Sequence, residues 1–231
     1  MTPKGVLPLR PAKAAEAPGS AQAPAPPGIT RWWWVRHGPV PGLKGRILGR
    51  SDVACDTSDL DALIILADRL PPGATLLVSP LLRARQTAQA LENAGALLQP
   101  AEEEDDLREQ DFGTWEGHAW TELMTREPPD PAVTTFWSDP AREAPPEGES
   151  FAQVMARVAH VVETWSERMD GGDVVVVGHA GPIRAAVAQA LDLSPAAALR
   201  LGIDPLSLTR IDRHAGPPRG WSVQCVNETI P

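Results

Sequence analysis

The chain has 231 residues, enough for one sizeable core and short for two full domains. Its 21 lysine and arginine residues face 30 acidic residues, and the resulting net charge of −9 argues against a general nucleic-acid-binding protein. No apolar stretch approaches the length of a membrane span, so we expect a soluble, cytoplasmic protein with no membrane partner. Cys55 and Cys225 belong to no paired-cysteine motif and are expected to be free thiols.

The first 29 residues are dominated by proline and alanine and have no apolar periodicity. This composition predicts a disordered tail over residues 1–29 in front of a single domain over residues 30–231. No apolar segment follows the basic residues of the tail, which argues against a secretory signal. An organelle transit peptide and an over-extended start of the chain are the two other interpretations of this segment.

Strand and helix patterns alternate along the rest of the chain. In the first half we expect strands over residues 32–36, 75–78 and, more weakly, 96–99, and helices over residues 60–70 and 80–94. In the second half we expect helices over residues 150–170 and 182–191, a strand over residues 173–177, and a hairpin of strands over residues 206–211 and 221–226. The repeated strand–helix order predicts an α/β fold, a three-layer α/β/α sandwich with a largely parallel sheet in a single domain.

Two of the expected strands end in a histidine beside a glycine. The apolar run WWWV leads into Arg36, His37 and Gly38, and the run VVVV leads into Gly178 and His179. Such continuous apolar runs are typical of strands buried on both faces. Because residues just past the strand ends line the ligand crevice of an open parallel sheet, two imidazoles and an arginine at one crevice indicate a phosphate-handling site.

A third expected strand adds an arginine to the same edge of the sheet. It ends at residue 78, and Arg83 or Arg85 lies in the first turns of the helix that follows. A helix N-terminus favours anions, and an arginine there adds a planar pair of donors. Together with Arg36, His37 and His179 it would form the cationic, donor-rich pocket that phosphoryl transfer requires.

Five segments occur in a fixed order along the chain: VRHG at 35–38, SPLLRARQTA at 79–88, LREQDFGTWEG at 107–117, PEGES at 146–150 and GHAG at 178–181. Together they resemble the successive signatures of the histidine phosphatase superfamily, the phosphoglycerate-mutase-like group, in its small phosphatase branch. The resemblance covers residues 31–195 and implies a histidine acid phosphatase-type hydrolase.

This resemblance also implies a role for each matching residue. His37 would be the nucleophile that becomes phosphohistidine, and Glu109 would be the general acid and then the base that activates water. Arg36, Arg83 and His179 would bind and neutralise the phosphoryl oxygens, so that His179 serves both catalysis and phosphate binding. The nucleophilic imidazole must be neutral at its attacking nitrogen, with its other N–H held by an acceptor, whereas His179 would work best when protonated.

Several neighbours compete for these roles. Arg85 is the alternative to Arg83, and Asp111 and Glu116 are the alternatives to Glu109; the register of the motifs favours Arg83 and Glu109. The aromatic residues of the same segment, Phe112 and Trp115, are expected to pack the loop rather than to contact substrate.

One stretch departs from the family pattern. In many members a serine or threonine and then an asparagine follow the arginine-histidine-glycine motif and add phosphate donors, but here Pro39 and Pro41 lack even a backbone N–H. Part of the usual phosphate cradle is therefore missing, and Lys44, Arg46 or Arg50 could compensate. The departure bears on the identity of the substrate more than on the type of reaction.

These observations predict a metal-independent phosphomonoesterase without a cofactor, which acts through phosphohistidine on a small phosphorylated metabolite. The first alternative is a mutase, which returns the phosphoryl group to a bound product; the 30 or so residues between Gly117 and Gly148 are short for the cap of a mutase. The second alternative is a phospho-ligand-binding module that has lost catalysis. The sequence contains no metal-ligand pattern, and it does not indicate which phosphomonoester is used or the oligomeric state.

Overall fold

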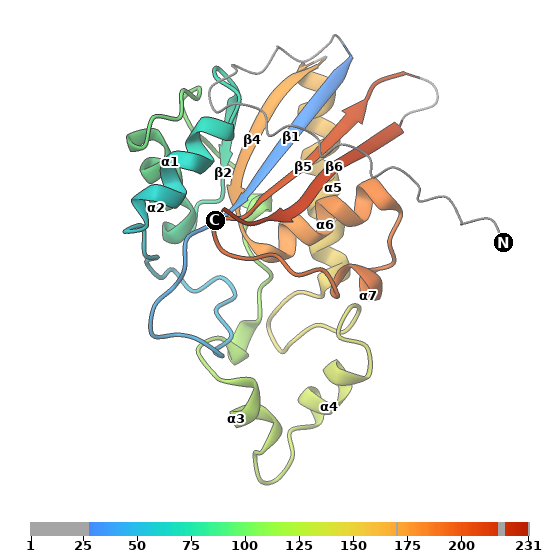
Figure 1. Cartoon of the computed structure of the whole chain (residues 1–231). Coiled ribbons are helices and arrows are strands. Elements are labelled where there is room, and N and C mark those ends of the chain that lie inside the picture. Colours follow the sequence, from blue (N-terminus) through green and yellow to red (C-terminus); the bar gives the residue numbers. More distant parts are fainter. Residues whose placement is uncertain (1–27, 170, 217–219, 231) are drawn as a thin grey trace, which may run out of the picture.

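The computed structural model describes residues 28–169, 171–216 and 220–230 (Figure 1). The predicted proline- and alanine-rich tail therefore lies outside the described residues, apart from its last two positions. Strand β1 (Ile29–Arg36) already includes residue 29, one position before the predicted start of the domain. Within the described part of the chain, no helix has both the length and the apolar character that a membrane crossing requires.

One six-stranded sheet forms the centre of the domain, with the strand order β3-β2-β4-β1-β5-β6. The strands other than β1 are β2 (Thr75–Val78), β3 (Glu102–Glu103), β4 (Gly172–Gly178), β5 (Leu208–His214) and β6 (Gly220–Glu228). The first four strands in that order pair in parallel, and β5 and β6 are antiparallel. The expected, largely parallel sheet is confirmed.

The third strand does not lie where the sequence predicts it. Residues 96–99 form backbone hydrogen bonds with the turn in front of β2: Gly73 N–H donates to Leu97 O, and Gln99 N–H donates to Ala74 O. Pairing with β2 itself begins only at Glu102 and Glu103, two exposed residues of the sheet edge. Leu97 is exposed, whereas Ala96 and Leu98 pack with residues of α1 and α2, so the apolar stretch at 96–99 does not mark a strand.

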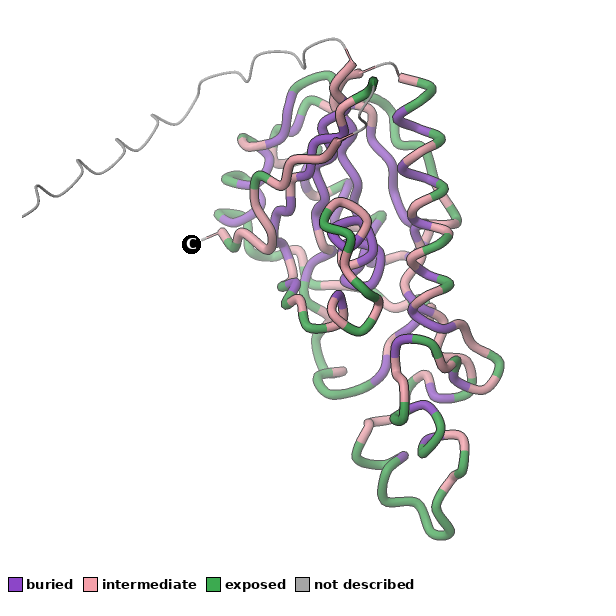
Figure 2. Tube along the Cα trace, turned by 90° about the vertical axis from the view of Figure 1, so that its right-hand side faces the viewer, coloured by how far each residue is buried: buried purple, intermediate pink, exposed green. Residues whose placement is uncertain are grey.

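Helices cover both faces of the sheet, as Figures 1 and 2 show. The long helices are α1 (Leu60–Arg69), α2 (Leu82–Asn93), α5 (Phe151–Met169) and α6 (Ala180–Leu191), and the short ones are α3 (Trp120–Met124), α4 (Pro131–Ser138) and α7 (Pro195–Ala198). Trp32, Trp34 and Val176 pack against α5 and α6, whereas Trp33 and Val175 pack against α1 and α2. This alternation confirms the three-layer α/β/α sandwich and explains why both strand sequences are apolar throughout.

Two of the three consecutive tryptophans in β1 have a hydrogen-bond partner for the indole N–H. Trp32 Nε1 donates to Ser166 Oγ at 3.1 Å, and Trp33 Nε1 donates to Asp173 Oδ1 at 2.9 Å. Asp173 lies on the neighbouring strand β4 and also forms an ion pair with Arg31 of β1. Because a buried indole needs a partner for its N–H, these bonds allow large side chains to fill the core on both sides of the central strand.

A cap formed by residues 113–148 projects beyond the sandwich and carries α3 and α4 (Figures 1 and 2). Its small core contains Trp115 and Phe136, which Trp120 joins by stacking on Phe136 with ring centroids 5.7 Å apart. Neither helix of the cap follows from the sequence pattern, because each has only one or two turns and shows too little periodicity. The two ends of the cap meet at its base, where the backbone of Gly113 lies against residues 146–148.

Substitution of Gly113 by alanine should destabilise the attachment of the cap. A Cβ there would lie 2.0 Å from Pro146 O, and the φ of +52° is itself unfavourable for alanine. Gly117→Ala is the matched control, since Gly117 also has a positive φ but nothing within 4 Å of the added Cβ. We expect Gly117→Ala to lower the free energy of unfolding by about 1–2 kcal/mol and Gly113→Ala by about 1–3 kcal/mol more, measured by urea unfolding. Equal losses would contradict the packing role of Gly113.

Candidate active site

The pairing of β1 with β4 brings the two motif histidines together. Arg36 and Gly178 are registered partners at the ends of these parallel strands, so His37 and His179 follow at the same edge of the sheet. His37 N–H donates to Gly178 O at 2.9 Å, and the two imidazole centroids lie 5.1 Å apart. Strand β2 ends at this edge as well, which brings the N-terminus of α2 and Arg83 to the site.

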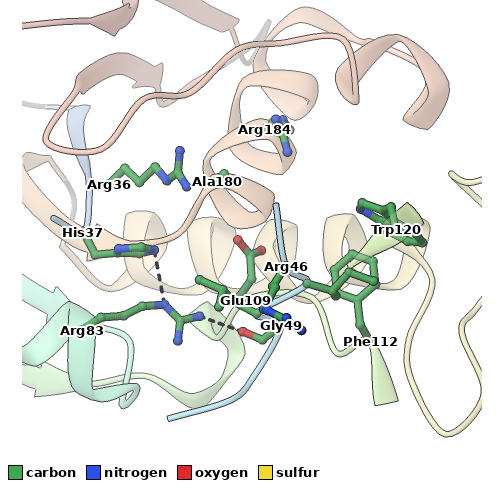
Figure 3. Close-up of a pocket in the computed structure, with 12 residues that line it drawn as sticks. Arg36, His37, Arg46, Gly49, Arg83, Glu109, Phe112, Trp120, Ala180 and Arg184 are labelled. Atoms are coloured by element: carbon green, nitrogen blue, oxygen red, sulfur yellow. Dashed lines mark hydrogen bonds between the residues drawn. The ribbon is translucent and has the colours of Figure 1, made fainter. Parts of the chain in front are cut away.

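The hydrogen bonds of His37 determine which of its nitrogens carries the proton. Nδ1 lies 2.7 Å from Gly38 O, and a carbonyl can only accept, so Nδ1 is the protonated nitrogen. Nε2 lies 3.3 Å from Arg83 Nε, an obligatory donor, and therefore presents its lone pair (Figure 3). Burial lowers the pKa of His37 to about 3, with the Gly38 bond opposing this change and the charges of Arg83 and Arg36 adding to it. The imidazole is thus neutral at physiological pH.

Arg83 is held in place by backbone carbonyls. Its Nη1 donates to Ser51 O and its Nη2 to Gly49 O, each at 2.7 Å, and the residue is buried (Figure 3). Arg85, the alternative in the same motif, is exposed and forms an ion pair with Glu103 at 3.7 Å. The structure therefore places Arg83 and not Arg85 beside His37.

Arg36 and His179 both contain buried polar atoms without a partner in the described part of the chain. Arg36 donates through Nη1 to Ile203 O, and its Nε has no partner. His179 contacts Ser79 Oγ through Nε2 at 2.7 Å, and its Nδ1 has no partner. Burial, with the charge of Arg83, lowers the pKa of His179 well below its usual value, so this ring is also neutral in the free site.

Glu109 lies at the N-terminus of α6, where a carboxylate is favoured by the helix dipole. Its Oε1 accepts hydrogen bonds from Gly181 N at 3.0 Å and from Gln110 N at 2.9 Å. A Cβ at position 181 would lie 2.2 Å from this oxygen, so the last glycine of the GHAG motif provides the space for the carboxylate. The loop after Leu107 and the helix after His179 thereby meet at one carboxyl group.

The two alternative acids have structural contacts instead. Asp111 accepts a hydrogen bond from Gly113 N at 2.8 Å and lies 3.5 Å from an Arg50 nitrogen. Glu116 accepts from Arg50 N at 2.6 Å and from Ser51 Oγ at 2.7 Å. Of the three carboxylates, Glu109 lines the cavity next to His37, and the other two do not.

An ion-pair network supports the backbone of Glu109. Arg157 on α5 donates to Glu109 O at 3.2 Å and to Glu149 Oε1 at 2.8 Å, and Arg50 reaches the same Glu149 oxygen at 2.9 Å. Burial alone would raise the pKa of Glu149, but the hydrogen bond and charge of Arg157 lower it overall. Glu149, the second glutamate of the PEGES segment, therefore joins the loop that carries Arg50, the Glu109 loop and α5.

These residues surround a cavity of about 390 Å³ (Figure 3). Its lining comprises Arg36, His37, Arg46, Ile47, Leu48, Gly49, Arg83, Glu109, Phe112, Trp120, Ala180 and Arg184. The fifth predicted site residue, His179, is fully buried beside His37 and does not reach the cavity surface.

Three aromatic or basic residues of the lining add to the sequence-based expectations. Phe112 packs edge-on against Trp120, as expected of a loop-packing residue, and it also lines the cavity. Trp115, in contrast, is buried as expected. Trp120 and Arg184 are not singled out by the sequence. A signal for Arg184 does exist, because it lies one helical turn after Ala180 and so on the same face of α6.

Lys44, Arg46 and Arg50, which could compensate for the phosphate donors missing at Pro39 and Pro41, have different positions. Arg46 lines the cavity of about 390 Å³ described above. Lys44 lines a neighbouring cavity of about 500 Å³, which also contacts Arg36, His37 and Pro39. Arg50 is instead engaged with Glu149 and Asp111.

The fold and this site are those of a known class of phosphate-handling proteins. The family model of the histidine phosphatase superfamily (branch 1) matches residues 32–229, and the chain belongs to that superfamily.

Three relatives illustrate the range of the family. A metal-independent phosphoserine phosphatase of Arabidopsis thaliana is 30% identical over 162 residues, which cover 68% of this chain and 67% of that protein. A glucosyl-3-phosphoglycerate phosphatase of Mycolicibacterium vanbaalenii is 34% identical over 179 residues, which cover 71% and 76%. A bifunctional protein of Mycobacterium tuberculosis is 36% identical over 156 residues, or 68% of this chain. The chain spans only 41% of the length of that protein.

Solved structures show the same architecture. A mycobacterial glucosyl-3-phosphoglycerate phosphatase superposes with a TM-score of 0.71 at 25% identity, covering 87% of this chain and 100% of that chain. A second structure, described as mycobacterial hydrolase 2, has a TM-score of 0.73 at 25% identity and covers 88% and 92%.

The buried, neutral state of His37 predicts a pH-dependent loss of stability. As the pH falls from 6.5 towards 3, the unfolded chain binds a proton at His37 that the folded chain does not, so stability is lost. Each such group contributes about 1.4 kcal/mol per pH unit. The free energy of unfolding of His37→Gln, measured with urea between about pH 4 and pH 6, should therefore change less steeply with pH than that of the wild type, by about 1.4 kcal/mol per pH unit. The exposed His160 offers the control His160→Gln, which should keep the wild-type slope. A wild-type slope in His37→Gln would refute the burial argument.

Proposed function

We propose that this chain is a metal-independent phosphomonoesterase of the histidine acid phosphatase type, which transfers the phosphoryl group of a small phosphorylated metabolite to His37 and then to water. The observation that supports this proposal most directly is the fixed tautomer of His37. Its Nδ1–H is bound by Gly38 O, so the lone pair is on Nε2, which accepts from Arg83 Nε, and Glu109 lines the same cavity.

In the first step, His37 Nε2 attacks phosphorus, and the bond between phosphorus and the leaving oxygen breaks. Glu109 in its protonated form gives its proton to that oxygen. In the second step, Glu109 as a carboxylate takes a proton from water, which attacks the phosphohistidine and releases phosphate and neutral His37. Throughout both steps the Nδ1–H of His37 stays bound to Gly38 O, so the ring does not turn as its charge changes.

Positive charge from the protein would stabilise the transition state. The guanidinium groups of Arg36 and Arg83 lie at the cavity. Arg36 Nε and His179 Nδ1 are buried behind them without a partner, and we propose that they bind phosphoryl oxygens once the phosphoryl group has entered between the arginines and His37. A bound phosphoryl dianion would also raise the pKa of His179, because it offsets the charges of the two arginines. His179 would then become protonated when substrate binds rather than in the free enzyme. These cations supply the charge neutralisation that we propose operates without a metal ion.

The dimensions of the cavity and the relatives support a small substrate. About 390 Å³ suits a metabolite of modest size, and the relatives include phosphatases named for phosphoserine and for glucosyl-3-phosphoglycerate. We also propose a cytoplasmic location, which the two free cysteines, Cys55 and Cys225, support because free thiols suit a reducing compartment.

Hydrolysis of p-nitrophenyl phosphate in the presence of EDTA tests the proposal. Wild-type protein should turn the ester over at an unchanged rate when EDTA is added, and His37→Ala should lower the rate to background because it removes the proposed nucleophile. His160→Ala, on an exposed face of α5, is the control and should keep wild-type activity. Near-normal hydrolysis by His37→Ala would contradict the mechanism, and loss of wild-type activity in EDTA would contradict metal independence. Absence of hydrolysis in every protein, the wild type included, would favour the mutase or the phospho-ligand-binding module.

A second experiment tests the acid. Glu109→Gln should slow hydrolysis of an alkyl phosphate by about 10²–10⁴-fold and slow p-nitrophenyl phosphate less, because nitrophenolate leaves without needing a proton. Phosphate should still bind as a competitive inhibitor. Glu103→Gln, an exposed carboxylate at the sheet edge, is the matched control. The comparison is made on kcat/KM, which reports the steps up to phosphoryl transfer to His37 and not the later hydrolysis of phosphohistidine. An equal decrease in kcat/KM for both esters would exclude Glu109 as the general acid of the first step.

A further inference from the structure

The carboxylate of Glu116 has no part in the proposed mechanism, although it lies close to the site. Glu116 is half-buried at the base of the cap, and its Oε1 accepts hydrogen bonds from Arg50 N at 2.6 Å and from Phe112 N at 3.3 Å. Its Oε2 accepts a hydrogen bond from Ser51 Oγ at 2.7 Å. Two of these three donors belong to one turn, residues 49–52.

The same turn holds the guanidinium group of Arg83. Arg83 Nη2 donates to Gly49 O and Arg83 Nη1 donates to Ser51 O, each at 2.7 Å (Figure 3). The turn therefore contacts Glu116 through its N–H and O–H groups and Arg83 through its carbonyl groups.

One planar peptide group connects the two charged side chains. The C=O of Gly49 and the N–H of Arg50 belong to the same trans peptide, in which they point in opposite directions. Among the described residues, this peptide is hydrogen-bonded to Glu116 at its N–H and to Arg83 at its C=O. The side chain of Arg50 anchors the turn separately, by its ion pair with Glu149. Because the peptide is rigid, the carboxylate that binds the N–H also fixes the direction of the carbonyl that Arg83 uses.

Gly49 gives the carboxylate access to this peptide. Its φ is +51°, and an added Cβ would lie 2.0 Å from Glu116 Oε1. A side chain at position 49 would therefore push the carboxylate away from the N–H of Arg50. The close approach of Glu116 to the turn depends on glycine at this position.

Several charges act on Arg83 besides that of Glu116. Burial lowers the pKa of Arg83. The charges of three carboxylates oppose this change, namely those of Glu109, Asp52 and Glu116, and the charge of Arg36 adds to it. Glu116 is therefore close enough to influence Arg83 by its charge as well as through the turn.

The two influences of Glu116 have opposite effects on anion binding. As a charge alone, Glu116 would weaken the binding of an anion at Arg83, because it offsets part of the positive charge. As a support for the guanidinium group, it would strengthen the binding, because it keeps the donors in one position. Substitutions that remove the charge and the support separately distinguish the two.

We infer that Glu116 positions Arg83 for phosphate binding, through the peptide group between Gly49 and Arg50. The inference rests on the proposed function, in which Arg83 binds the phosphoryl group. Glu116 does not line the cavity, so it is a positioning residue and not a catalytic one. Through this carboxylate, the base of the cap contributes to the phosphate site.

The test measures the dissociation constant of inorganic phosphate by calorimetry, which needs no turnover. Glu116→Ala removes both the charge and the acceptor of the Arg50 N–H. Glu116→Gln removes the charge but keeps an oxygen for that N–H, and its amide nitrogen can donate to Ser51 Oγ. The control, Glu92→Ala, removes an exposed carboxylate from the far end of α2, the helix that carries Arg83.

Glu116→Ala should weaken phosphate binding by about ten-fold, the effect of one charge-assisted hydrogen bond. Glu116→Gln should bind phosphate at least as tightly as the wild type, and Glu92→Ala should match the wild type. Phosphate binding by Glu116→Ala at wild-type strength or tighter overturns the inference, because a charge effect alone gives this result. Equal weakening in Glu116→Gln and Glu116→Ala also overturns it. If Glu116→Ala does not fold, Glu116→Asp replaces it, since the shorter side chain withdraws the acceptor and should likewise weaken binding.

A double-mutant cycle shows whether the effect passes through Arg83. In the background of Arg83→Met, Glu116→Ala should change phosphate binding by less than about two-fold, because the group that Glu116 positions is absent. The same loss in both backgrounds would indicate a general weakening of the fold and would overturn the inference.

Failure of the proposed function would give a different result, since the wild type would then bind no phosphate. The position of Arg83 can be followed without phosphate by the nitrogen–proton NMR signal of its Nε, which donates to His37 Nε2. This signal should be alike in wild type and Glu116→Gln, and it should move towards the signals of exposed arginines in Glu116→Ala. An unchanged signal in Glu116→Ala overturns the inference whether or not phosphate binds.

Discussion

The parallel pairing of β1 with β4 is the constraint on which the site depends. Both strands are buried on both faces, and their register aligns Arg36 with Gly178. A shift of one residue would turn three tryptophans and four valines to the wrong helical layers, so the packing of the core fixes the alignment. The positions of His37 and His179, which follow these strands, are therefore restricted. The hydrogen bond from His37 N–H to Gly178 O extends the β1–β4 hydrogen-bond ladder into the site.

Burial gives the site its chemical character. Both imidazoles are removed from water, which keeps them neutral, while the permanent charges come from arginines whose guanidinium groups are held by carbonyl oxygens. In the proposed mechanism, nucleophile and positive charge are thus supplied by different side chains. Arg83 Nε donates to His37 Nε2, the proposed nucleophilic atom, and an arriving phosphoryl group would compete for that donor.

Much of this arrangement follows from the sequence, and the exceptions have physical causes. Strands that are apolar throughout, each followed by histidine and glycine, identify the sheet edge without knowledge of the fold. The contact of Glu109 with Gly181 joins segments 72 positions apart, and neither segment alone indicates it. The expected strand at 96–99 is wrong because pairing with β2 begins only at Glu102 and Glu103, two exposed acidic residues that no apolar pattern marks.

The cap is the part of the fold that the sequence predicts least well, because its structure also depends on contacts between residues far apart in the chain. Helices α3 and α4 are too short for a periodic signal, and they are held by aromatic rings that gather only in the folded chain. Trp120 faces the cavity because it stacks on Phe136, a neighbour sixteen positions away. The sequence does not indicate Arg184, although its spacing from Ala180 is helical, because the motif ends at Gly181 and includes no later residue of the helix.

The contact between Gly181 and Glu109 has a consequence for how such proteins diverge. Position 181 has room for a hydrogen atom and little else, because the carboxylate oxygen occupies the space of a side chain. Replacement of this glycine by any other amino acid would displace the acid and leave the strands, the histidines and the arginines in place. If Glu109 is the acid of the proposed mechanism, a side chain at position 181 would slow hydrolysis while the arginines still bind phosphate, so that this one position separates turnover from ligand binding.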